Sequence, residues 1–173
     1  DPNSSVVAKR VKRSEGLFFK FLYQMHKLIT LSFTGKNINF GNYSCLTKKD
    51  ANIISSKPSL WSSYSGTVKK FVKNFNEINS TRGLRYFGPS KMSFIKLLIH
   101  SLSIVAVFKL QVILRSFIII CALHFSNFFN QTIENTTYFL LIIFNLTIFL
   151  ISLRENEKDL INSQNNLSSI DDK

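Results

Sequence analysis

Two uncharged stretches, 116-SFIIICALHFSNFFNQTI-133 and 135-NTTYFLLIIFNLTIFLISL-153, decide the fold of the C-terminal half of this chain. They are 18 and 19 residues long, and charged residues bracket them at Arg115, Glu134 and Arg154. As helices at 1.5 Å per residue they would measure about 27–29 Å, close to the roughly 30 Å of a membrane's hydrocarbon core. The sequence therefore predicts two transmembrane helices within residues 111–153.

The segment before these stretches has the pattern of a helix that lies in the plane of a membrane surface. Residues 93–110 carry a wide apolar face, while Lys96, His100 and Ser103 follow one another along a polar stripe. An amphipathic helix of this kind buries its apolar side at the boundary between headgroups and acyl chains. We therefore predict an interfacial helix over 93–110.

Charge is unevenly distributed along the chain. Residues 1–115 hold 19 Lys and Arg against 4 Asp and Glu, whereas residues 154–173 hold 3 against 5. Because Lys and Arg near the ends of membrane spans favour the cytoplasmic side, we expect an integral membrane protein with both ends in the cytoplasm. Residues 154–173 are rich in Asn and Ser, which predicts a disordered cytoplasmic tail.

The N-terminal part alternates predicted strands with predicted helices. β-branched or turn-bounded runs indicate strands at 4–8, 40–46 and 77–80, and an amphipathic pattern indicates a helix over 15–33 that ends at Gly35. Thr47 with Asp50 three residues later is a capping signal for another helix, and further helical spacing follows Pro58. This alternation predicts an α/β domain around a mostly parallel sheet. Three strands make a small core, so we expect the rest of the domain upstream.

Five short motifs follow one another along the chain: Val6–Gly16, Thr34-Gly35, Phe40–Ser44, Ser59-Leu60-Trp61 and Arg82–Met92. In this order they resemble the later half of family 2 glycosyltransferases, in particular the membrane-anchored enzymes that use polyprenyl-phosphate or dolichyl-phosphate. The resemblance covers roughly residues 5–153. It implies that residues 1–92 are the C-terminal, acceptor-side portion of a GT-A (Rossmann-like) domain, followed by the interface helix and the two-helix membrane hairpin.

The resemblance also implies site residues. Arg10 and Arg13 match arginines that follow a strand and grip phosphate, and guanidinium groups suit that task because they pair bidentately with phosphate oxygens; a solvated basic turn is the alternative. Gly41-Asn42-Tyr43 stands where many relatives have Gly-Asp-Phe, and Asn42 cannot act as a base as a carboxylate does. The loop before the membrane segment supplies Arg82, Arg85, Ser90 and Lys91 for an anionic substrate, or for lipid headgroups in general.

The resemblance implies a nucleotide-sugar donor and a lipid-linked acceptor for the complete enzyme. Mg²⁺ or Mn²⁺ is expected there on an Asp-x-Asp motif of the first half, which these 173 residues lack. We therefore expect no metal on this chain and no sugar transfer by it alone. Contact with membrane lipid is expected, nucleic acid is not, and a homo-oligomer is left open.

Two other functions fit parts of the pattern. A noncatalytic membrane adaptor would use the same basic face to bind anionic lipid or a partner protein. A soluble nucleic-acid binder would explain the formal charge of +12, but it does not explain 17 Phe and two spans of membrane length.

Overall fold

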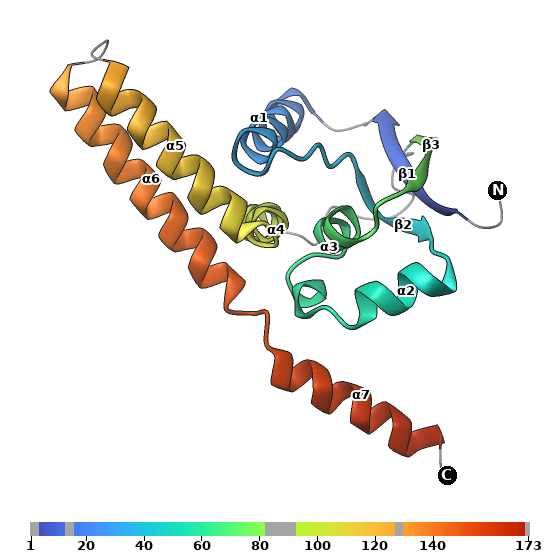
Figure 1. Cartoon of the computed structure of the whole chain (residues 1–173). Coiled ribbons are helices and arrows are strands. Elements are labelled where there is room, and N and C mark those ends of the chain that lie inside the picture. The colour runs from blue at the N-terminus through green and yellow to red at the C-terminus, as the bar shows by residue number, and fades with distance from the viewer. Residues whose placement is uncertain (1–3, 13–15, 82–92, 127–129, 172–173) are drawn as a thin grey trace.

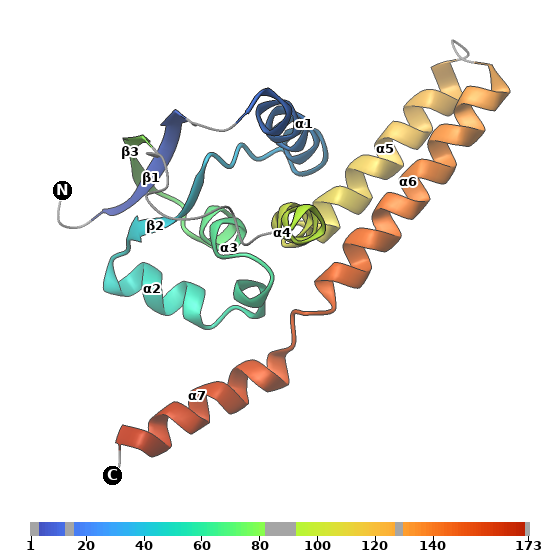
Figure 2. The ribbon, with the colours of Figure 1, turned by 180° about the vertical axis from the view of Figure 1, so that it is seen from behind.

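The computed structural model describes residues 4–12, 16–81, 93–126 and 130–171. A small sheet unit lies beside a long pair of helices, and a further helix leads away from them (Figures 1 and 2). The elements are β1 (Ser5–Lys12), α1 (Leu17–Thr34), β2 (Phe40–Cys45), α2 (Lys48–Ser55), the short 3₁₀ helix η1 (Pro58–Trp61), α3 (Tyr64–Phe71), β3 (Phe75–Thr81), α4 (Phe94–Ala106), α5 (Lys109–Ser126), α6 (Gln131–Ser152) and α7 (Glu157–Asp171).

The sheet has the strand order β2-β1-β3, and it is mixed rather than mostly parallel. β1 pairs with β3 in parallel and with β2 antiparallel. The prediction of an α/β unit is confirmed, but the predicted parallel character holds for one of the two pairs. The reason lies in α1, which packs on α4 and α5. Because it does not serve as a crossover that returns the chain to the same end of the sheet, β2 enters in the opposite direction.

One face of the sheet is covered by α2 and α3. Val7 of β1 and Phe40 of β2 form a buried cluster with Ile54, Val68 and Val72, which those helices supply. The predicted cap of α2 is confirmed, since Thr47 Oγ1 accepts a hydrogen bond from the Asp50 N–H at 3.2 Å. We call these three strands with α2, η1 and α3 the sheet unit.

The second core joins the other helices. Val105, Ala106, Val112 and Ile148 are buried together where α4, α5 and α6 meet, and Phe33 at the end of α1 packs against them. α5 and α6 run side by side as an antiparallel hairpin (Figures 1 and 2). Both are long and apolar enough to cross a membrane, and 11% and 17% of their most apolar stretches are buried. Most of the apolar surface of the hairpin is therefore uncovered.

Polar contacts fasten the base of the hairpin to the sheet unit. Lys70 of α3 donates a hydrogen bond from Nζ to the Val107 carbonyl at 2.6 Å. Lys109 at the start of α5 forms an ion pair with Glu155, just past α6, at 3.0 Å. Burial lowers the pKa of Lys70, the charge of Glu155 raises it, and that of Lys109 lowers it. These contacts connect both ends of the hairpin with α3.

The structure corrects two of the expected boundaries. Where a disordered tail was expected over 154–173, the chain forms α7 with Leu160 buried and Glu157 and Asp159 in its first turn, where acidic side chains favour a helix. The predicted interfacial segment 93–110 becomes α4 alone, because the chain turns after Ala106 and α5 begins at Lys109.

Candidate functional site

The Gly41-Asn42-Tyr43 motif lies at an irregularity of the sheet. Val7 pairs with Ser44, but two residues further along β1 the partner of Lys9 is Phe40, four residues back along β2. The intervening β2 residues are therefore bulged out of the regular ladder. Such bulges re-aim side chains and are common beside functional sites. Asn42 is exposed, and Tyr43 is 76% exposed.

Arg10 lies directly against this bulge. Its backbone N–H donates to the Asn39 carbonyl at 3.0 Å, which holds the end of β1 beside the start of β2. A Cβ added at Gly41 would lie 3.0 Å from the Arg10 Cζ and would clash with Nη2. The guanidinium therefore crosses the backbone at Gly41, where a larger residue would displace it. The structure thus brings together two of the predicted site residues from different strands.

The charge of the same cation reaches His100 of α4. Desolvation lowers the pKa of His100, and the positive charge of Arg10 lowers it further. The side chain is nevertheless open to solvent on one side. Sequence reasoning placed His100 on the polar stripe of α4 but did not connect it with Arg10, because the electrostatic interaction joins residues 90 positions apart. The arrangement offers a cation held at the bulge and, within reach of its charge, an imidazole with a lowered pKa, a combination that suits an anion.

The structure does not describe the other predicted arginines or the end of the loop before α4. Arg13, Arg82, Arg85, Ser90 and Lys91 lie outside the described residues. Their proposed contact with substrate therefore stays a prediction.

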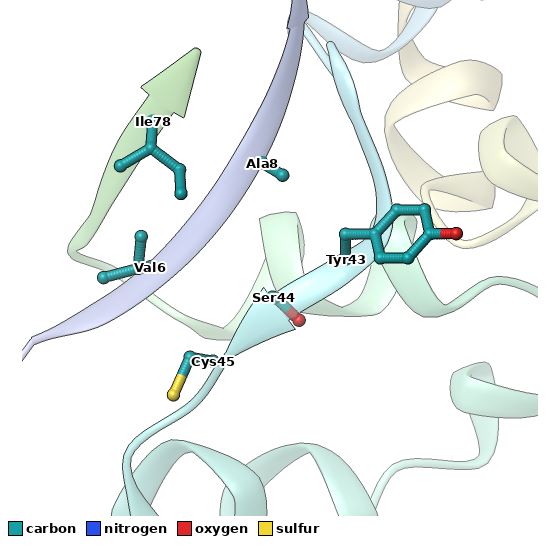
Figure 3. A pocket seen from close by; sticks show the side chains of 6 residues that line it. All are labelled: Val6, Ala8, Tyr43, Ser44, Cys45 and Ile78. Carbon is teal, nitrogen blue, oxygen red and sulfur yellow. The ribbon is translucent and has the colours of Figure 1, made fainter. Parts of the chain in front are cut away.

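The face of the sheet opposite α2 and α3 carries a shallow hollow of about 210 Å³. Its side chains come from all three strands, and Figure 3 shows Tyr43 turned away from the others. Apolar groups dominate it, and it offers an anion no cation among its lining residues. The hollow is lined by Val6, Ala8, Tyr43, Ser44, Cys45 and Ile78.

Arg115, which was expected to mark a membrane boundary, is tied to the end of α1. Its Nη1 donates to the Ser32 carbonyl at 3.0 Å. Gly35 ends α1 in the left-handed conformation with φ of 68°, as predicted, and its N–H donates to the Leu31 carbonyl. A guanidinium at a helix C-terminus is favourable because the last carbonyls carry partial negative charge. The end of α1 is thereby fixed to α5.

Metal binding and known relatives complete the description. Within the ranges that the structure describes, no three His, Cys, Asp or Glu side chains group as a metal site. The divalent metal that the resemblance implies for a complete glycosyltransferase stays a prediction. No family model, no curated protein and no solved structure matches this chain.

Proposed function

We propose that this chain is the acceptor-side, membrane-attached part of a family 2 glycosyltransferase, which moves a sugar from a nucleotide diphosphate to a lipid phosphate. The observation that carries the proposal is the position of Arg10. Its guanidinium crosses the bulge at Gly41, and its charge acts on His100 of α4, whose C-terminal end packs into the hairpin. A cation held on a unit that is joined to two helices of membrane length suits an anion attached to a lipid.

The orientation in the membrane is part of the same proposal. α5 and α6 cross the bilayer, and the sheet unit with its excess of Lys and Arg lies on the cytoplasmic side. α4 then lies at the membrane surface, where Phe94, Ile95 and Leu98 are exposed. An acceptor phosphate held at headgroup depth would meet Arg10 from the bilayer side.

The chemistry available to the described residues is binding and orientation. Arg10 stays charged at any relevant pH and can pair with two phosphate oxygens at once. His100 can donate a hydrogen bond to a third oxygen. Asn42 offers a neutral amide, so it can orient an acceptor but cannot remove its proton. In the complete enzyme a divalent metal would neutralise the nucleotide diphosphate.

Binding of a lipid phosphate in nanodiscs tests the proposal. We expect Arg10→Gln to weaken binding of a polyprenyl phosphate about tenfold or more, because a charge-assisted hydrogen bond contributes roughly 1.5–3 kcal/mol. Lys49→Gln removes the same charge from an exposed position of α2 and is the matched control. Equal weakening by both variants, or equal affinity for phosphatidylglycerol, would indicate a general basic surface and contradict the proposal.

The pH dependence of binding tests the place of His100. Its pKa in the folded chain lies below the ordinary 6.5, so protonation at lower pH adds a positive charge beside Arg10. Affinity for a phosphodiester probe of constant charge should rise as the pH falls below about 6.5, and His100→Gln should flatten this rise. Without a bound anion, lowering the pH has the opposite effect on the stability of the folded chain. The unfolded chain binds the proton more readily, so the free energy of unfolding falls in the same range.

A further inference from the structure

α1 presents an apolar face whose large side chains are each at least 40% exposed. Its large apolar side chains point outward at spacings of three and four residues. At about 100° per residue they occupy an arc of roughly 140° on the helix surface. The exposed side chains of this arc are Leu17, Phe18, Phe21, Met25, Leu28 and Leu31.

The opposite side of α1 explains why this arc faces outward. Thr30 and Thr34 are buried, and Phe33 packs against Phe144 of α6 with ring centroids 4.7 Å apart. α1 therefore packs on the rest of the protein through Thr30, Phe33 and Thr34 near its C-terminus, and the apolar arc points away from this packed side. In a protein surrounded by water the reverse arrangement would be expected.

The height of α1 along the hairpin identifies what covers the arc. The end of α1 meets α5 at Arg115 and α6 at Phe144, well inside both helices rather than at their base (Figures 1 and 2). The apolar surface of α1 therefore continues the exposed apolar surface of α5 and α6. Lys20 and Lys27 project just beyond the Leu31 edge of the arc, where they would meet anionic headgroups.

We propose that α1 is a second helix in the membrane surface, lying at the cytoplasmic face with this arc among the acyl chains. α1 would then attach the sheet unit to the bilayer at a second place, in addition to the base of the hairpin. Arg115, bound to the Ser32 carbonyl, then lies at the same depth as the end of α1. The proposal depends on the hairpin crossing a membrane but not on sugar transfer.

The single Trp of the chain makes a direct test available. Trp61 belongs to η1, on the sheet unit, and serves as the reference in the unaltered protein. In a Trp61→Phe background, Phe21→Trp places the fluorophore in the centre of the arc. In nanodiscs of phosphatidylcholine and phosphatidylglycerol brominated in the acyl chains, we expect strong quenching at position 21 and little at Trp61.

Two further variants keep the test decisive. Leu28→Trp lies on the same arc about two turns from position 21. It replaces Phe21→Trp if that variant does not fold. Lys20→Trp is the matched control beside Phe21, on the basic edge, and should be quenched less. An emission at positions 21 and 28 that is quenched by aqueous acrylamide, and not by bromine, would overturn the proposal. Protection from both quenchers would also overturn it, because the arc would then be covered by protein or by a second copy of the chain.

Discussion

In the sheet unit Val7 and Val68 are fully buried, whereas in the hairpin Phe117 is 62% exposed and Leu146 is 55% exposed. Both regions are rich in large apolar side chains, but the sheet unit buries many of them and the hairpin leaves most of them exposed. An apolar side chain is driven from water in the first region, while in the second it needs no partner if lipid is its solvent. This difference is what the proposed membrane hairpin predicts, because the two regions would then fold in different solvents.

The largest loss of stability is expected from a charge placed in the buried core of the sheet unit. Val68→Asp places a charge without a partner among Val7, Phe40 and Val72, and we expect it to cost about 4 kcal/mol or more. Rapid proteolysis of the sheet unit in nanodiscs, with the hairpin left protected, would be observed. Simultaneous loss of both regions would show that they fold as one unit and would break the comparison.

A substitution in the hairpin gives the next largest effect. Phe117→Asp alters an exposed side chain, and on a surface facing water it would change stability by less than about 0.5 kcal/mol. In a membrane the same change should cost roughly 2.5–3.5 kcal/mol of insertion free energy. Insertion into microsomal membranes measures it. Ile78→Asp, at a position 57% exposed on the open face of the sheet, is the control and should leave the sheet unit stable.

A smaller effect is expected where α1 joins the hairpin. Gly35→Ala should cost about 1–2 kcal/mol, because a side chain disfavours φ of 68° and the new Cβ would lie 2.5 Å from the Arg115 Nη2. Gly35→Asn should cost less, since Asn tolerates this conformation better. Denaturant unfolding in detergent compares the two.

The Arg115→Gln background separates the two causes at Gly35. If the clash with the guanidinium matters, part of the cost of Gly35→Ala disappears in that background, and the part due to φ remains. An unchanged cost would mean that Arg115 moves aside freely and does not fix the end of α1.

Local signals in the sequence predicted much of this fold. Thr47 with Asp50 located a helix start, Gly35 located a helix end, and Arg154 marked the end of the hairpin, whereas α5 begins at Lys109, before the expected boundary at Arg115. Each of these signals acts within one or two turns of the chain, so it can be recognised without knowledge of the tertiary structure.

What the sequence did not predict depends on distant contacts. The apolar periodicity of α1 indicated an amphipathic helix, but periodicity does not say whether protein, water or lipid meets the apolar side. The antiparallel entry of β2 follows from where α1 packs. At the site, the contact of Arg10 with Gly41 depends on strand register, and its proximity to His100 depends on the position of α4. α7 was missed because Asn and Ser have low helix propensity.

The smallest effect is expected from breaking a hydrogen bond between two polar side chains. Such a bond should contribute a similar free energy in the two regions. In the hairpin Asn145 Nδ2 donates to Ser116 Oγ at 2.8 Å, and in the sheet unit Ser59 and Thr67 share a buried hydrogen bond of 3.0 Å. One would expect lipid to strengthen the first pair, but hydrogen bonds between membrane helices average only about 0.6 kcal/mol, because the separated helices also find partners for their polar groups.

A double-mutant cycle with Asn145→Leu and Ser116→Ala should therefore give a coupling of about 0.6 kcal/mol. The hairpin stays folded in every variant because its packing involves Val112, Leu141 and Ile148 as well. Reversible unfolding in lipid–detergent mixtures measures the coupling. A coupling near zero would mean that the pair exchanges with water. The hairpin would then be a hydrated surface, and the contrast with the sheet unit could not be one of solvent.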